Sequence, residues 1–225
     1  MIQAPYNNLL VTIETKYIEN FTNMLKAAAI NHGSQINPAD YVQIIGTIES
    51  LPQEICNRRE YKGYTLDNIK VGDKAIFRYD VVFDFLEQED GSAKFKNMFW
   101  CKGKEYWTVD IQKLFAVIRD GEIIMVNGYC MLEDMTKPPL ILLPQHMKRM
   151  ATAAKAILTH IGKPTFHMKK IDAQEGDIVF YNPFLVQQYK IKDKEFGIIP
   201  QHHILGIEIP KINPKIFLNL CCKFS

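Results

Sequence analysis

Four short blocks of this chain occur twice in the same order, and this internal repeat restricts the possible folds more than any other feature. In one of them a Gly-Asp turn leads into an apolar stretch, at Gly72-Asp73 and again at Gly176-Asp177. Recurrence of several blocks in a fixed order indicates two copies of one structural unit. The matched pairs are 7–12 with 121–126, 42–52 with 154–164, 71–77 with 175–181, and 104–118 with 194–208.

The repeat divides the chain into two predicted domains, residues 1–119 and 120–210, followed by a C-terminal tail, 211–225. A chain of 225 residues is long enough for two domains of about 100 residues, each with its own core. We expect the matched blocks to superpose. We also expect the closing aliphatic stretches, 114–118 and 204–208, to be buried.

The matched blocks have the composition of β-strands. They are short, rich in Val, Ile, Phe and Tyr, and bounded by Gly, Asp, Asn and Pro, which is typical of a small barrel or sandwich. Residues 19–30 and 145–158 have a helix-forming composition instead. Each of these two segments follows the first block of its copy, so they occupy equivalent long connections. A long connection within a compact β domain is often functional or disordered.

The second of these connections contains an aliphatic run bracketed by Pro138, Pro139 and Pro144. Such a run can be a buried strand or an exposed binding element. Because proline removes backbone donors and impairs pairing within a sheet, the bracket favours the exposed alternative. The residues of the run are Leu140, Ile141, Leu142 and Leu143.

Composition argues against several classes of partner. The chain is 47% hydrophobic and 23% charged with a formal net charge of +2, so no strong field favours nucleic acid or an anionic membrane. No apolar run approaches the roughly 18 residues that span a bilayer, and the amino terminus lacks the pattern of a secretory signal. Five scattered cysteines indicate reduced thiols rather than a disulfide framework. We therefore expect a cytoplasmic protein.

No pattern in the chain indicates an enzyme. The motifs G-x-S-x-G, P-loop and H-E-x-x-H are absent. His202 and His203 fall in a polar step between matched strand blocks, and His160 and His167 have no carboxylate pair or cysteine at a ligand spacing. We predict no catalytic residue, no metal site and no cofactor.

The order of blocks in the second copy resembles the GroES-type co-chaperonin family. The order is EIIMVNG, a long loop with an aliphatic triplet, KAILTHIG, EGDIVFY and YKIKDKEFGIIPQHHILGIE. The resemblance covers residues 121–209 and, through VQIIGTI, VGDKAIF and KGKEYWTVDIQKLFAVI, about 4–119. It implies a mainly β fold of two tandem GroES-like irregular β-barrels with long loops of partly helical composition.

The resemblance also implies a function. Proteins of this family form rings that cap a chaperonin cylinder of the GroEL type, which uses ATP in assisting protein folding, and first and last strands meet between subunits. A mobile loop after the first strand carries an aliphatic triplet into a hydrophobic groove of the chaperonin. In this chain Ile141, Leu142 and Leu143, together with Leu140, stand at the place of that triplet. A homo-oligomer that binds a chaperonin is therefore expected.

The chain departs from the family pattern at several points. Prolines stand where the family tends to place glycines before the triplet, and the loop of the first copy offers only Met24 and Leu25 as a possible second contact, beside the apolar residues 27–30. The first copy also has a longer candidate roof hairpin, 49–68, and an extra polar hairpin or loop, 87–97. An alternative keeps the two barrels without the chaperonin, as a structural or adaptor module. The zinc alcohol dehydrogenases contain a similar barrel, but this chain lacks their glycine-rich dinucleotide segment.

Overall fold

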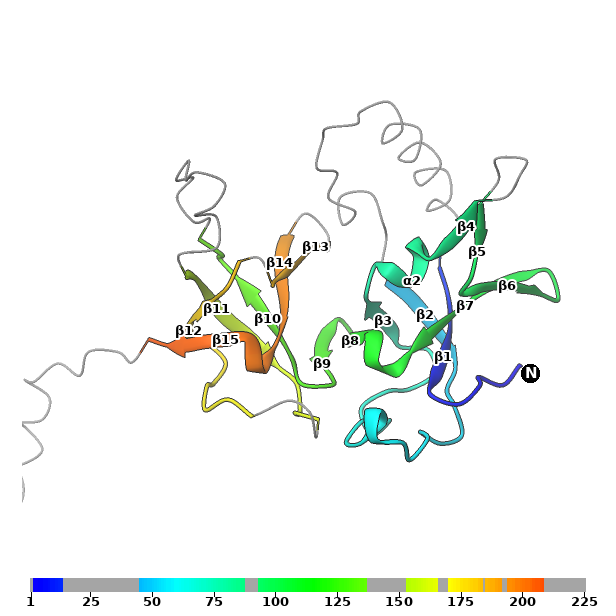
Figure 1. Cartoon of the computed structure of the whole chain (residues 1–225), viewed down its shortest axis with the longest axis horizontal. Helices are drawn as coiled ribbons and strands as arrows, with labels where there is room; N and C mark the ends of the chain where they lie inside the picture. Colours follow the sequence, from blue (N-terminus) through cyan, green and yellow to red (C-terminus); the bar gives the residue numbers. More distant parts are fainter. Residues whose placement is uncertain are drawn as a thin grey trace, which may run out of the picture.

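The computed structural model describes residues 2–13, 45–87, 93–136, 153–165, 170–183, 185–191 and 194–208. These residues form a mainly β structure with two antiparallel sheets (Figure 1). The first sheet contains β1 (Asn8–Thr12), β2 (Ile45–Ser50), β3 (Lys74–Phe77), β6 (Met98–Cys101), β7 (Lys104–Asp110), β8 (Leu114–Arg119) and β9 (Glu122–Met125). The second contains β10 (Tyr129–Glu133), β11 (Ala154–Ile161), β12 (Ile178–Tyr181), β13 (Gln187–Ile191), β14 (Lys194–Pro200) and β15 (Ile204–Ile207).

The shorter elements lie between these strands. β4 (Phe85–Glu87) and β5 (Ala93–Phe95) pair as a small hairpin that begins before, and overlaps, the extra hairpin or loop expected at 87–97. The expected roof hairpin at 49–68 is wrong, because β2 ends at Ser50 and the only element between β2 and β3 is the 3-10 helix η2 (Arg59–Tyr61). The other helices of the described residues are α2 (Asp80–Phe83), η3 (Ile111–Lys113) and η5 (Gln201–His203).

Both sheets follow the same path. The first has the order β6-β7-β1-β2-β3-β8-β9, and the second has the order β13-β14-β10-β11-β12-β15. Each described strand of the second sheet therefore has a counterpart in the first, and among the described strands only β9 is additional. We call residues 2–119 and 126–208 the first and second repeat.

The register of pairing is also repeated. The β1–β2 ladder is interrupted between Leu10 and Val11, and the β10–β11 ladder is interrupted between Met131 and Leu132. The β3–β8 and β12–β15 ladders likewise share an irregularity before their last pair. Because β-bulges are specific local features, their repetition strengthens the equivalence of the two sheets.

The structure corrects the alignment of one block that the sequence match had paired. The sequence match placed Thr47 opposite Thr159, whereas the pairing Thr12↔Thr47 corresponds to Glu133↔Ile157. Thr47 therefore corresponds to Ile157, two positions earlier. Side chains alternate with a period of two along a strand, so a shift of two preserves the pattern of buried faces and is hard to detect from sequence.

A second block was matched to the wrong strand. Residues 121–126 were matched to β1, but they contain β9, which pairs with β8 in the first sheet. The counterpart of β1 is β10, because Asn8 N donates to Pro5 O at 3.2 Å as Tyr129 N donates to Val126 O at 3.1 Å. The two segments are both apolar in composition, but they pair with different strands.

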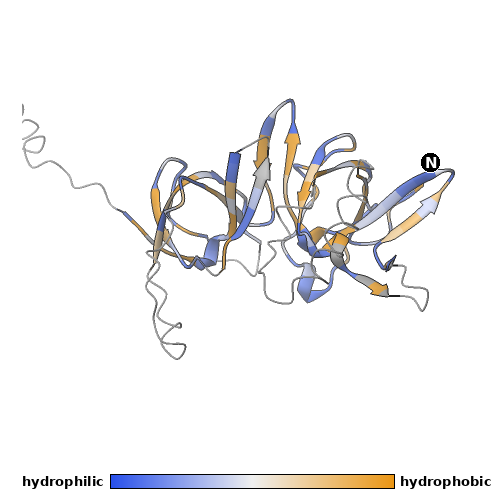
Figure 2. Cartoon of the chain, turned by 90° about the horizontal axis from the view of Figure 1, so that it is seen from above, coloured by the Kyte–Doolittle hydropathy of each residue, from blue (hydrophilic) through white to orange (hydrophobic). Residues whose placement is uncertain are grey.

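The described residues form two hydrophobic cores, a larger one that extends across both repeats and a smaller one within the second repeat. Seen from above, the sheets lie side by side and each curves round its own interior (Figure 2). Among the described strands no pairing joins the first and last strand of either sheet, so each sheet is open. The larger core includes residues of both repeats, among them Trp107, Phe115, Tyr129, Tyr189 and Phe196.

Several predicted elements can be compared directly with the structure. Gly176 lies in a turn that leads into β12, as expected. The helical interpretation of 145–158 is wrong at its end, because Ala154 begins the strand β11; residues 19–30, 145–152 and the tail 211–225 lie outside the described residues. The closing stretch of the first repeat is largely buried, whereas in the second Leu205 is 64% exposed. The expected burial of 204–208 is therefore wrong. Within the described residues, no helix is long and apolar enough to cross a membrane.

Candidate functional site

The residues predicted to contact a partner lie outside the described residues. They belong to two connections, 13–44 between β1 and β2, and 134–153 between β10 and β11. Because β1 and β2 correspond to β10 and β11, the two connections stand at equivalent places in the two repeats. The predicted residues concerned are Met24, Leu25, Leu140, Ile141, Leu142 and Leu143.

The chain is clamped where it leaves β10 and where it returns to β11. Thr136 N donates to Lys155 O at 2.8 Å, and Lys155 N donates to Thr136 Oγ1 at 2.9 Å. The Lys155 ammonium also lies 3.1 Å from a carboxylate oxygen of Glu208. The described residues on either side of 137–152 therefore lie close together on the sheet.

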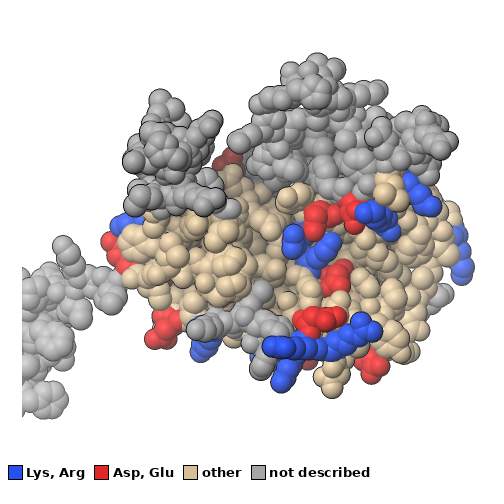
Figure 3. Space-filling model, viewed as in Figure 1, with Lys and Arg blue, Asp and Glu red and all other residues tan. Residues whose placement is uncertain are grey.

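In the first repeat, hydrogen bonds between side chains hold the end of β1. Thr12 Oγ1 donates to Glu49 Oε1 at 2.9 Å, and Lys104 Nζ lies 2.8 Å from the same oxygen. The hydrogen bond from Lys104 is the main cause that lowers the pKa of Glu49. Figure 3 shows acidic and basic side chains interspersed on the first repeat, without a face of single sign in this view.

A cavity of about 350 Å³ lies beside the end of β10. The Glu133 carboxylate and Lys194 ammonium, 2.8 Å apart, are in its lining. Gly197 on β14 gives room for Met135, because a Cβ at this position would lie 2.5 Å from the Met135 sulfur. The lining consists of Glu133, Asp134, Met135, Thr136, Tyr181, Pro183, Val186, Gln188, Lys194 and Glu195.

The histidines of the second repeat do not assemble a metal site within the described residues. The His202 and His203 rings lie 4.2 Å apart at 70°. Burial, followed by the neighbouring His202, lowers the pKa of His203. In the described part of the chain, no group of three or more His, Cys, Asp or Glu side chains could hold a metal ion. His167 lies outside that part.

One described cysteine, Cys130, is unsuited to act as a nucleophile. Cys130 is buried in the second repeat, and burial raises the pKa of its thiol to about 12. A thiol with a raised pKa is a poor nucleophile at neutral pH because the thiolate is the reactive form. Cys56 and Cys101 are partly exposed, and Cys221 and Cys222 lie outside the described residues.

An aromatic cluster joins the two repeats, and the sequence reasoning did not identify it. The ring of Phe115 packs edge-on against Tyr129 at 4.6 Å and against Tyr189 at 5.7 Å. Asn127 Nδ2 donates to Leu114 O at 3.0 Å, and Val126 N donates to Phe115 O at 2.9 Å. We call this contact the internal interface.

One sequence signal could have indicated the internal interface. In the block match 104–118 with 194–208, Phe115 corresponds to Leu205, so both repeats place a large apolar residue at one position. A repeated apolar position is consistent either with a core or with a repeated contact. The sequence reasoning considered only the core.

No family model matches the chain, and no curated protein matches it. These comparisons therefore identify no family for the chain. The resemblance to GroES-type co-chaperonins remains a hypothesis.

Proposed function

We propose that this chain is a co-chaperonin-like protein that caps a chaperonin ring and assists ATP-dependent protein folding. ATP would be bound by the partner. The observation that carries the proposal is the repeated sheet with a long connection at the same place in both repeats, between β1 and β2 and between β10 and β11. The family that the sequence blocks resemble uses the connection after its first strand to contact the chaperonin.

The chemistry of the second connection supports a hydrophobic contact. Leu140, Ile141, Leu142 and Leu143 form an uninterrupted aliphatic run. Transfer of one such side chain from water into an apolar groove contributes roughly 1.5–3 kcal/mol. Flanking prolines reduce the conformational entropy that the segment loses when it is ordered by a partner. Short segments of this composition are therefore suited to docking.

The clamp at Thr136 and Lys155 supports the same proposal. A connection whose two ends are fixed at one point of a rigid sheet can contact a partner without disturbing the fold. A substitution within 140–143 should then alter binding and leave folding intact. The first connection, with Met24 and Leu25, would be a second contact of lower hydrophobicity.

The test is ATP-dependent capture of the protein by a chaperonin ring. We expect the wild type to be retained on the chaperonin with ATP and released without it. Leu142→Glu should weaken retention by about tenfold or more, because a charge cannot enter an apolar groove without a large desolvation cost. The matched control is Val71→Glu, which places the same charge on a residue that is 61% exposed and distant from both connections in the chain. Its retention should equal that of the wild type.

Thermal unfolding separates docking from burial in a core. If 140–143 were a core strand, Leu142→Glu would lower the melting temperature sharply. An early-melting variant contradicts the proposal, and so does a variant that melts normally and still caps the chaperonin. In the second case, Leu25→Glu tests whether the first connection makes the contact instead. A wild type that no chaperonin retains would favour the adaptor alternative.

A further inference from the structure

One position in the two repeats differs greatly in side-chain volume. In β7, Trp107 pairs with Val11. In β14, Gly197 pairs with Leu132, which follows the same β-bulge as Val11. Gly197 therefore stands in the place of Trp107. Because the Trp107 side chain is fully buried, the second repeat has no indole ring at a place where the first repeat buries one.

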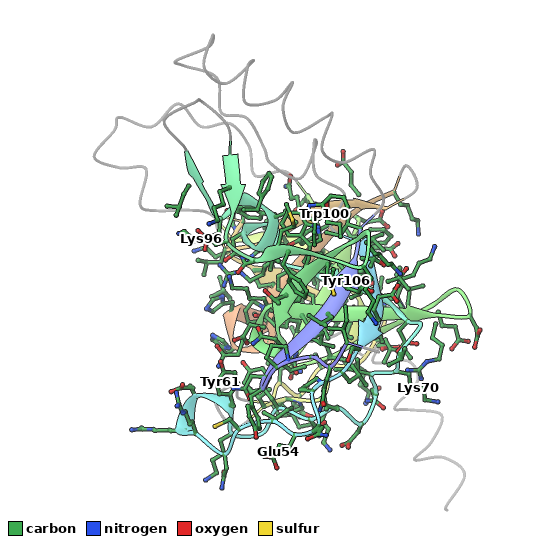
Figure 4. All side chains as sticks on the ribbon, turned by 90° about the vertical axis from the view of Figure 1, so that its right-hand side faces the viewer. Glu54, Tyr61, Lys70, Lys96, Trp100 and Tyr106 are labelled. Carbon is green, nitrogen blue, oxygen red and sulfur yellow. The ribbon has the colours of Figure 1, made fainter. Side chains whose placement is uncertain are left out.

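In the first repeat the indole ring is held by an aromatic contact and by a carboxylate. The Phe95 ring packs edge-on against the Trp107 ring, with centroids 5.3 Å apart. Trp107 Nε1 donates to Glu105 Oε1 at 2.6 Å. Figure 4 looks onto the first repeat and labels Tyr106, which lies between Glu105 and Trp107 in the chain. This place in the fold therefore accommodates an aromatic ring with an N–H group.

In the second repeat this space is only partly filled. Met135 Sδ and Val186 Cγ2 lie 2.5 and 2.7 Å from the position that a Cβ on Gly197 would take, so these two side chains occupy the space nearest the backbone. Both also line the cavity of about 350 Å³ beside the end of β10. A cavity of this volume is large enough for a small ligand. Cavities left where a large apolar side chain is removed can bind small aromatic molecules.

The cavity retains the carboxylate that binds the indole in the first repeat. Glu195 is the counterpart of Glu105 in the block match, and it lines the cavity. Within the part of the chain that the structure describes, no group donates to the Glu195 carboxylate. The second repeat has therefore kept the acceptor at this place and lost the ring that donates to it.

A buried hydroxyl group also belongs to the lining. Tyr181 in β12 is the counterpart of Phe77 in β3, and it is 2% exposed. Burial raises the pKa of Tyr181, so the hydroxyl is neutral at physiological pH and can donate or accept a hydrogen bond. Among the described residues it has no hydrogen-bond partner. Because an unpaired buried hydroxyl is costly, its presence where the first repeat has Phe77 favours a ligand with a polar group.

We propose that this cavity binds a small planar aromatic ligand with a ring N–H group, of the indole type. The ring lies among the apolar side chains of the lining and donates its N–H to Glu195, as Trp107 donates to Glu105 in the first repeat. The lining contains three carboxylates and one ammonium group, so a positively charged substituent on the ring adds to the attraction. The inference goes beyond the proposed function and does not depend on the chaperonin.

Calorimetric titration of the purified protein with indole, without chaperonin or ATP, tests the site. Benzofuran is the matched control ligand, because it has the shape of indole with an oxygen atom in place of the N–H group. Indole should bind about tenfold or more tightly than benzofuran, since only indole can donate a hydrogen bond to the carboxylate. Tryptamine, which adds an ammonium group to the indole ring, should bind at least as tightly as indole.

Substitution of the carboxylate should abolish the preference for indole. Glu195→Leu removes the acceptor, and indole and benzofuran should then bind with equal affinity. Glu195 is exposed, so the substitution should leave the fold intact. The matched control is Glu122→Leu, the same change at an exposed strand residue outside the cavity lining, and it should keep the preference. Should Glu195→Leu melt early, the comparison of the two ligands on the wild type carries the test.

NMR spectra of protein labelled at the methionine methyl groups locate the ligand. Indole should shift the methyl signal of Met135, which is identified by its absence from the spectrum of Met135→Leu. N-acetyltryptophanamide distinguishes the two sources of such a ring. If it binds as tightly as indole, the ligand is a tryptophan side chain of a polypeptide. If it is excluded while indole binds, the ligand is a free small molecule.

Four outcomes overturn the inference. The first is a wild type that binds no indole, and the second is equal binding of indole and benzofuran by the wild type. The third is a folded Glu195→Leu variant that still prefers indole. The fourth is a Met135 signal that stays unshifted when the protein is saturated with indole, because the ring would then bind elsewhere. None of these results bears on retention by a chaperonin, so this inference and the proposed function can fail separately.

Discussion

The first and second repeats have the same strand order and register, but their equivalent residues differ in burial and charge. Phe115 is fully buried where Leu205 is 64% exposed. Asp73 is 4% exposed and bound by Arg119, whereas Asp177 is partly exposed. The sequence match gives the uncharged Ile209, which lies outside the described residues, as the counterpart of Arg119. The same backbone therefore supports a closed side in one repeat and an open side in the other.

This difference shows which features a duplicated fold preserves. Both Gly-Asp turns keep their backbone hydrogen bonds: Gly72 N donates to Ile48 O at 2.8 Å, and Gly176 N to Leu158 O at 2.7 Å. These bonds are local and are made within each repeat. Burial of a side chain on the outside of a sheet depends instead on what covers it. The closing strand of the first repeat, β8, lies beside the second repeat, whereas no described repeat lies beside β15.

The largest expected difference between the repeats is in the loss of stability when the side chain of Phe115, or of its counterpart Leu205, is removed. Phe115→Ala should lower the free energy of unfolding by about 3–5 kcal/mol, because it leaves a cavity among packed rings. Leu205→Ala should change it by less than about 0.5 kcal/mol, as expected for an exposed residue. Denaturant unfolding at the lowest practical protein concentration measures both, since assembly then adds least to stability. Equal losses would show that β15 is covered within one chain.

A smaller difference is expected in the stability cost of replacing Asp73 or its counterpart Asp177. Arg119 Nε and an Arg119 terminal nitrogen lie 2.8 and 2.7 Å from the two Asp73 carboxylate oxygens. Asp73→Asn should cost about 1.5 kcal/mol because it removes a charged hydrogen-bonded pair. Asp177→Asn should cost less, since its carboxylate accepts from Gln174 N at 2.8 Å and an amide oxygen can replace it. A larger loss at Asp177 would contradict the assigned difference.

The same pair should make stability depend on acidity. The hydrogen bonds from Arg119 are the main cause that lowers the pKa of Asp73 below 3.8, the ordinary value for an aspartate side chain. A folded-state pKa below the unfolded one means that the unfolded state binds the proton more readily. The contribution is therefore present above about pH 3.8 and is lost as the pH falls through the folded-state pKa. Asp73→Asn should flatten the acid side of a profile of melting temperature against pH, and an unchanged acid side would contradict the role assigned to this pair.

The smallest difference is expected at the glycines of the two turns. Gly72 and Gly176 have φ of +93° and +96°, and no atom lies within 4 Å of an added Cβ at either position. Alanine at either site should cost about 1 kcal/mol, because a side chain disfavours this backbone conformation. The two losses should agree within about 0.5 kcal/mol, as measured by denaturant unfolding. Unequal losses would mean that one turn is less tightly specified than the other.

The sequence determined the repeat and most of its strands. The Gly-Asp turns and the blocks 104–118 and 194–208 could be matched without a structure, because local turn chemistry and strand composition recur together. The structure places β7 and β14, η3 and η5, and β8 and β15 at those matched positions. Residues 140–143 and Met24 and Leu25 were predicted from sequence alone and lie outside the described residues.

Only the tertiary structure decided register, the partner of β9 and the internal interface. The block containing Thr47 was misplaced by two residues because a period-two pattern looks the same after that shift. Residues 121–126 and β1 are both apolar, and composition cannot tell which strand either one pairs with. Phe115 and Leu205 hold equivalent positions in the sequence repeat, yet one is buried and the other exposed. The physical reason is that burial and strand pairing depend on contacts between two segments, and the sequence of one segment does not specify which other segment lies against it.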